Sequence, residues 1–261
     1  MALKLQRGIA ASVLPAFREV RSNRRSPRGF VSEFFTRSFD GVELRCELIE
    51  SDARRVVVVA HPAVVGSRYR QVIALANALS ESFSVVIFDF RGHGRSGGRC
   101  PLGFNDVSRD LEAVVERSSA MGFEKIGIAG FSLGAAAAVL LLSRRPCAGA
   151  AALIGCPPEF PDISGAVRHP LLFRAFLRLL GMRVDTVPDG GENPADVAFR
   201  LQGIPKLLVF GESEVFPASE IERFAASFPP PCERITIEGA WHADLMGKED
   251  DVKRWFEDQL R

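Results

Sequence analysis

The chain has 261 residues, of which 47% are hydrophobic, and its formal net charge at neutral pH is +1. This length and hydrophobic content predict one α/β domain with a small insertion and a large core, and the near-neutral charge argues against a nucleic-acid-binding surface. Five scattered cysteines without metal-ligand spacing suggest a reducing, cytoplasmic setting with no disulfide framework, and no apolar stretch is long enough to span a bilayer.

The first 29 residues differ from the rest of the chain. They carry seven lysines and arginines against one acid, Glu19, a net charge of +6. Apolar residues recur in this segment at near-helical spacing, which predicts a basic amphipathic N-terminal extension over residues 1–29. Three interpretations stay open: peripheral contact with an anionic membrane surface, a helix docked on the following domain, and a disordered tail. The short apolar run and the arginines that follow it argue against a secretory signal.

From residue 30 onward, strand and helix patterns alternate. Two alternating stretches around Asp40-Gly41 predict a hairpin. The strands expected next are 55–61, 84–89, 124–130, 148–154, 205–211 and 232–238, and the helices are 69–81, 105–120 and 134–142. This order predicts an α/β fold, with a mostly parallel central sheet and helices on both faces.

Residues 156–203 interrupt this alternation and divide the predicted core into 30–155 and 204–261. The interruption opens with several prolines, continues with an apolar helix-like stretch at 170–180, and ends in a polar turn region at 188–194. The apolar stretch either lines a pocket or packs as an ordinary helix on the core.

The most informative pattern is Gly130-x-Ser132-x-Gly134, which lies between the strand 124–130 and the helix 134–142. A serine on such a sharp strand-to-helix turn has a strained backbone and an exposed hydroxyl. Flanking glycines are needed because a side chain there would strike the neighbouring strand or helix. The context predicts that Ser132 is a nucleophile; the alternative is a structural serine in a tight turn.

A serine nucleophile needs a base to take its proton and an acid to orient that base, and both are expected later in the chain. Of the four histidines, only His242 follows a predicted strand near the C-terminus, and it is the expected base. The acid is expected in the polar loop 212–217 after the strand 205–211, where Glu212 and Glu214 compete.

Four motifs in this order resemble those of the α/β-hydrolase superfamily over about residues 33–260. They are His61-Pro62, similar to a His-Gly pair; Asp89–Ser96, similar to D-x-R-G-x-G-x-S; Gly211-x-x-Glu214, similar to G-x-x-D; and Gly239-x-x-His242. The segment from His61 to Ser96 resembles the serine aminopeptidase and monoacylglycerol lipase branch. The resemblance implies the α/β-hydrolase fold with a small helical cap formed by the insertion, and its register favours Glu214 over Glu212 as the acid.

The resemblance also implies an oxyanion hole made by the backbone N–H groups of Leu133 and Ala63. The sequence departs from the family pattern at two places, where Pro62 replaces glycine and the acid is a glutamate. Pro62 has no N–H to donate, but Ala63 does.

The expected function is that of a serine hydrolase, an esterase or lipase, which cleaves the carboxylic ester or thioester of a small molecule through an acyl-enzyme on Ser132, with no cofactor and no metal. Alternatives are hydrolysis of an amide, peptide or acylglycerol, and acyl transfer. A non-catalytic binding protein that retains the fold is the alternative from another class. The expected location is cytoplasmic, with peripheral membrane contact if residues 1–29 bind lipid, and the oligomeric state stays open.

Overall fold

The computed structural model describes residues 31–52, 54–160, 178, 182–188 and 190–261. The predicted N-terminal extension, residues 1–29, lies outside the described residues. So does the predicted apolar helix at 170–180, apart from Arg178.

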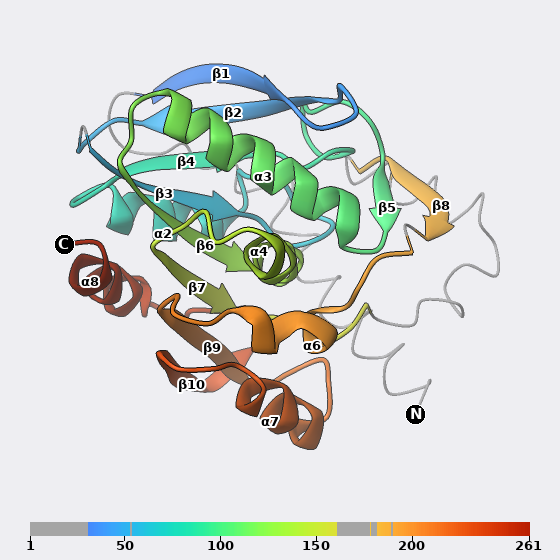
Figure 1. Ribbon diagram of the computed structural model, residues 1–261, viewed down its shortest axis with the longest axis vertical. Coiled ribbons are helices and arrows are strands. Elements are labelled where there is room, and N and C mark those ends of the chain that lie inside the picture. The colour runs from blue at the N-terminus through green and yellow to red at the C-terminus, as the bar shows by residue number, and fades with distance from the viewer. Residues whose placement is uncertain (1–30, 53, 161–177, 179–181, 189) are drawn as a thin grey trace.

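The centre of the molecule is an eight-stranded sheet with the strand order β1-β2-β4-β3-β6-β7-β9-β10 (Figure 1). In chain order these strands are β1 (Val31–Arg37), β2 (Glu43–Ile49), β3 (Arg55–Ala60), β4 (Ser84–Phe88), β6 (Lys125–Phe131), β7 (Ala150–Ile154), β9 (Lys206–Ser213) and β10 (Cys232–Trp241). Strand β2 is antiparallel to both β1 and β4, and all the other neighbours are parallel. The predicted hairpin and the mostly parallel sheet are therefore confirmed.

Helices cover both faces of this sheet (Figure 1). They are α2 (Arg70–Leu79), α3 (Asn105–Ala120), α4 (Leu133–Arg144), α7 (Ala218–Ala226) and α8 (Glu249–Gln259). Side chains of α3 and α4 pack in one hydrophobic cluster with one face of the sheet, and those of α2 and α8 pack in a second cluster with the other face.

Strand β3 shows why the central strands are apolar along their whole length. Val56 and Val58 belong to the first cluster, whereas Val57 and Val59 belong to the second. Because successive side chains of a strand point to opposite faces, a sheet covered on both sides buries every residue.

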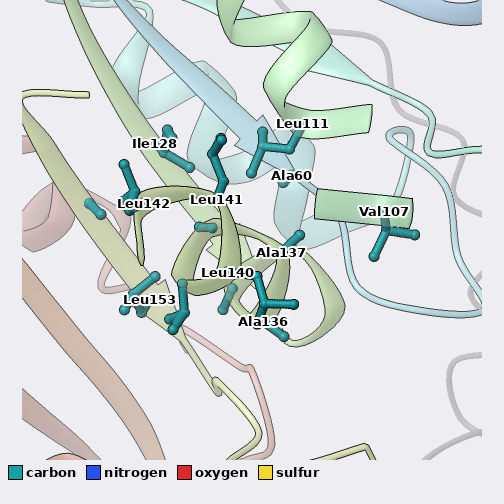
Figure 2. Packing of buried hydrophobic residues seen from close by; sticks show 14 of the residues in the cluster. Ala60, Val107, Leu111, Ile128, Ala136, Ala137, Leu140, Leu141, Leu142 and Leu153 are labelled. Atoms are coloured by element: carbon teal, nitrogen blue, oxygen red, sulfur yellow. The ribbon is translucent and has the colours of Figure 1, made fainter. Parts of the chain in front are cut away.

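Helix α4 is the most deeply buried helix of the first layer. Its residues from Leu133 to Leu142 are all buried. Figure 2 shows its alanines and leucines packed between β6 and β7 on one side and α3 on the other. The alanines allow close approach of the helix to the sheet, so the residue at its start is held by the core.

Several elements were not predicted from the sequence. Strands β5 (Cys100–Leu102) and β8 (Val184–Pro188) form a separate two-stranded parallel sheet, and α7 and α8 were not anticipated. The sequence predicted that Glu212 lies in the loop after the strand expected at 205–211. Strand β9 extends to Ser213, however, so Glu212 lies within the strand.

The predicted insertion at 156–203 contains, among its described residues, β8, a short helix α6 (Pro194–Val197) and a 3₁₀ turn (Ala198–Arg200). Backbone hydrogen bonds from Arg183 to Gly92 and from Cys100 to Arg183 join β8 to the loop that follows β4. Helix α6 contacts α4. The division of the chain at 156 and 203 stays a prediction.

Candidate active site

Ser132 occupies the single residue between β6 and α4, with φ 49° and ψ −105°. Few residues other than glycine adopt positive φ, and a strained backbone of this kind persists only where the surroundings enforce it. Here the Ser132 N–H donates to the carbonyl of Ile154 at 2.8 Å, and its own carbonyl accepts from Ala136 N–H at 2.9 Å. The turn is thus fixed by the neighbouring strand β7 and by the first turn of α4.

The two glycines of the motif are required by close contacts. A Cβ on Gly130 would lie 2.5 Å from backbone atoms of Gly134 and Ala135, and a Cβ on Gly134 would lie 2.4 Å from the carbonyl oxygen of Ala60. Both distances are far shorter than a carbon can approach, so only glycine permits this turn beside β3.

His242 lies directly after β10, and its Nε2 is 2.9 Å from Ser132 Oγ. Its Nδ1 makes a very short contact with Oε2 of Glu214. A carboxylate accepts the proton of Nδ1, which leaves the lone pair of Nε2 to accept the Ser132 hydroxyl proton. The structure therefore brings Ser132, His242 and Glu214 into one hydrogen-bonded chain.

The two candidate glutamates, Glu212 and Glu214, have different partners in the structure. The side chain of Glu214 is 6% exposed, and its Oε1 accepts from Gly211 N–H at 2.9 Å while Oε2 faces His242. Glu212 is exposed and accepts from Gly239 N–H at 2.8 Å. Glu214 is thus the carboxylate that contacts His242, in the register that the resemblance favoured. Its charge, together with burial, also raises the pKa of the Cys156 thiol well above its ordinary value.

Leu133 and Ala63 are the two residues whose N–H groups are expected to form an oxyanion hole. Leu133 is the first residue of α4, so its N–H has no partner within the helix. The N–H lies at the helix N-terminus, whose partial positive charge attracts anions. Ala63 follows β3, whose last residue Ala60 pairs with Gly130 at the end of β6. Val64, the next residue, has φ 71°, a strained value for a β-branched side chain. The role of both N–H groups stays a prediction.

The remaining described histidines are buried and act as structural residues. His61 Nε2 accepts from Phe90 N–H at 3.0 Å, and its Nδ1 lies 2.7 Å from the carbonyl oxygen of Pro62. His93 is 1% exposed, its ring centre lies 4.7 Å from that of His61, and its Nδ1 lies 3.1 Å from the carbonyl of Arg91. Burial lowers the pKa of His61 and lowers that of His93 to about 3, so both rings are neutral.

The D-x-R-G-x-G-x-S segment also has a structural role. Asp89 Oδ1 accepts hydrogen bonds from the backbone N–H and the hydroxyl of Ser67 at 2.9 and 2.8 Å. The buried guanidinium of Arg91 pairs with Asp110 and Asp40. These contacts hold the loop after β4, which contacts the imidazole of His61 through Phe90. Sequence reasoning gave the motif but not these partners, which lie far away along the chain.

A cavity of about 390 Å³ lies between the loop after β7 and helix α7. Its lining includes Pro158, Glu159 and Phe224 but neither Ser132 nor His242. Within the described ranges, no group of three or more His, Cys, Asp or Glu side chains is arranged to hold a metal ion. None of the helices in the described part of the chain is both long and apolar enough to cross a membrane.

Solved structures with a similar fold include esterases and an α/β-hydrolase. The Pyrococcus furiosus esterase Pf2001 superposes with a TM-score of 0.73 over 89% of this chain and 92% of its own, at 19% identity. An α/β-hydrolase from Novosphingobium aromaticivorans gives 0.67 over 88% and 99%, at 21% identity, and the esterase EaEST from Exiguobacterium antarcticum gives 0.68 over 88% and 99%, at 16% identity. At these identities the likeness shows the fold, and the α/β-hydrolase fold predicted from the motifs is confirmed.

The family follows from the sequence itself. The profile of the serine aminopeptidase family, S33, matches residues 51–202, more than half of the chain, and the chain belongs to this family of hydrolases. It is 32% identical over 165 residues to an uncharacterised protein of Mycobacterium tuberculosis strain H37Rv, a match that covers 62% of this chain and 53% of the relative. A putative carbamate hydrolase of Agrobacterium fabrum, RutD, is 36% identical over 69 residues, 26% of each chain. The chain thus spans about half the length, or less, of these curated relatives.

Proposed function

We propose that this protein is a serine hydrolase that cleaves a carboxylic ester or thioester of a small molecule through an acyl-enzyme on Ser132. The observation that carries the proposal is the hydrogen-bonded chain from Ser132 Oγ through His242 to the buried carboxylate of Glu214. A serine hydroxyl is a weak nucleophile until an oriented base takes its proton, and this arrangement supplies both the base and its orienting acid.

In the first half of the proposed reaction, Ser132 Oγ attacks the acyl carbonyl carbon while His242 Nε2 takes the hydroxyl proton. Glu214 stabilises the imidazolium that forms. The N–H groups of Leu133 and Ala63 donate to the developing oxyanion, where one donor is typically worth about 3–4 kcal/mol. As the carbon–oxygen or carbon–sulfur bond breaks, the imidazolium gives its proton to the leaving group.

In the second half, His242 takes a proton from water, and the hydroxide oxygen attacks the acyl carbonyl of the acyl-enzyme. Collapse of that intermediate releases the carboxylic acid and returns the proton to Ser132. The residues present are sufficient for every proton transfer, so the proposal includes no cofactor and no metal.

Ester hydrolysis is the activity named for two of the structural neighbours, the esterases of Pyrococcus furiosus and Exiguobacterium antarcticum. Amide or peptide hydrolysis is the activity that the family's description names, and carbamate hydrolysis is the one ascribed to the Agrobacterium relative. All of these substrates present a carbonyl carbon to the same serine. Acylglycerol hydrolysis and acyl transfer to an alcohol use the same acyl-enzyme and are separated by their products when an acceptor is added.

A binding protein that keeps the fold without turnover is the candidate from another class. Pro62 and the glutamate acid are its support, and the contacts of Ser132 and His242 argue against it. A cytoplasmic location, with peripheral membrane contact through residues 1–29, is part of the proposal.

A fluorophosphonate probe tests the proposal, because it reacts only with an activated serine. We expect the wild-type protein to be labelled and the Ser132→Ala variant not to be labelled. Ser67→Ala, which removes a buried hydroxyl bonded to Asp89, is the matched control and should be labelled like the wild type. An unlabelled wild-type protein that also fails to hydrolyse a panel of p-nitrophenyl esters of increasing chain length would favour the binding protein.

A further inference from the structure

Strand β10 has an irregularity immediately before His242. Its parallel pairing with β9 holds up to Ile237 opposite Gly211, and the next matched pair is Trp241 opposite Ser213. Between these pairs β10 advances by four residues and β9 by two, so β10 carries two extra residues. Such a bulge redirects the strand, and here it sets where the backbone of His242 begins.

Two contacts with the end of β9 hold the bulge. Gly239, in its middle, has φ 70°, and its N–H donates to Oε2 of Glu212 at 2.8 Å. The bulge also lies against Gly211 of β9. A Cβ on Gly211 would come within 2.7 Å of the carbonyl oxygens of Ala240 and Trp241. The bulge is thus fixed by one hydrogen bond and one close backbone approach.

The end of β9 also fixes the acid. Gly211 N–H donates to Glu214 Oε1, and Glu214 Oε2 contacts His242. Two neighbouring residues of β9, Gly211 and Glu212, therefore orient the carboxylate directly and the imidazole through the bulge.

We propose that Glu212 is a positioning residue for His242, an inference that rests on the proposed function of Ser132. A bulge leaves backbone groups without ladder partners, and Glu212 supplies the partner of Gly239. The hydrogen bond holds the bulge in the shape that puts His242 Nε2 within reach of Ser132 Oγ. Glu212 touches neither the serine nor the imidazole in this role, and it acts by geometry rather than by charge.

Four variants of the full-length chain separate geometry from charge. Glu212→Gln keeps an acceptor oxygen and loses the charge, Glu212→Asp keeps the charge but is one methylene too short, and Glu212→Ala loses both. Glu238→Ala removes an exposed carboxylate next to Gly239 and is the matched control. The measurements are kcat and KM for a p-nitrophenyl ester, with circular dichroism and thermal unfolding to verify folding.

We expect Glu212→Asp and Glu212→Ala to lower kcat by about three- to tenfold at unchanged KM, the size of effect that loss of one ordinary hydrogen bond produces. Glu212→Gln and Glu238→Ala should stay near the wild-type kcat. If Glu212→Ala does not fold, the comparison of Asp with Gln carries the test alone.

Wild-type kcat in the Asp and Ala variants would overturn the positioning role, and so would a Gln variant as impaired as the Asp variant. The Ser132→Ala variant is measured in parallel. Full activity in that variant would refute the proposed function itself, whereas an inactive Ser132→Ala with an unaffected Glu212→Asp would refute only the role of Glu212.

Discussion

The carbonyl oxygen of Ala60, at the end of β3, lies against Gly134 in the first turn of α4, so close that a Cβ on Gly134 would be 2.4 Å from it. This contact joins the strand that leads to Ala63 with the helix that begins at Leu133. The two loops that carry the proposed oxyanion donors are therefore held together by a position that admits only glycine.

Gly134→Ala should destabilise the protein by about 2–3 kcal/mol, because overpacking a rigid backbone contact forces β3 and α4 apart. Urea unfolding measures the loss. Gly149→Ala is the control, since a Cβ there would lie 3.1 Å from the end of the flexible Leu260 side chain and 3.8 Å, an ordinary contact distance, from the carbonyl oxygen of Ile126, and its cost should be clearly smaller. Equal free energies of unfolding for the two variants would contradict the account of the turn.

Ser132→Ala should abolish ester hydrolysis and leave the fold intact. Removal of a triad nucleophile typically costs about 10⁴–10⁶ in turnover, and the backbone of the turn is fixed by hydrogen bonds that do not involve the hydroxyl. The measurement is kcat for a p-nitrophenyl ester together with the circular dichroism spectrum. Undiminished hydrolysis by the purified variant would remove Ser132 from the mechanism.

Glu214→Gln should be far more damaging than Glu212→Gln. An amide beside Nδ1 of His242 cannot stabilise the imidazolium and favours the wrong tautomer, with a cost of up to about 10⁴ in kcat. Glu212 accepts only from the backbone of Gly239, a bond that glutamine can also make. If the two variants lost activity in the reverse order, Glu212 would be the acid.

The free energy of unfolding should fall as the pH drops below about 6.5, in part because of His61 and His93. Burial lowers the pKa of both histidines, that of His93 from 6.5 to about 3. The unfolded chain then binds protons that the folded state does not, and each such histidine contributes a slope of up to about 1.4 kcal/mol per pH unit. Urea unfolding between pH 7 and 5.5 measures this slope, which should be shallower in His93→Asn. Parallel curves for the wild type and the variant would show that His93 does not contribute.

Deletion of residues 1–29 should leave hydrolysis of a small soluble ester nearly unchanged, because this segment contains none of the proposed catalytic residues. If it binds membranes, deletion should weaken binding to anionic vesicles, and binding by the full chain should weaken as salt screens its net charge of +6. A large loss of soluble-ester activity with folding intact would mean that the segment shapes the substrate pocket instead.

The mostly parallel sheet and the alternation of its strands with α2, α3 and α4 were predictable because the buried strands are largely apolar runs and α4 is alanine- and leucine-rich. Helix α8 was missed although Val252, Trp255 and Phe256 have helical spacing, because its charged residues mask that pattern. Strands β5 and β8 were missed because each is short and contains a proline, and their pairing depends on residues far apart in the sequence.

At the site, local patterns singled out Ser132, His242 and the pair Glu212 and Glu214, because these residues lie at or just after strand ends at the same edge of the sheet. The competition between Glu212 and Glu214 could not be resolved locally. It depends on the two extra residues of β10 before Trp241, and a bulge is fixed by pairing with another strand rather than by its own sequence.

Mass spectrometry of the intact protein during turnover of a p-nitrophenyl ester tests the acyl-enzyme on Ser132 most directly. Acid quenching in the first turnover should trap a species heavier than the protein by one acyl group, and peptide mapping should place that group on Ser132. The Ser132→Ala variant should show no such species. Steady turnover by the wild type with no acyl adduct, or an adduct that persists in Ser132→Ala, would contradict an acyl-enzyme on Ser132.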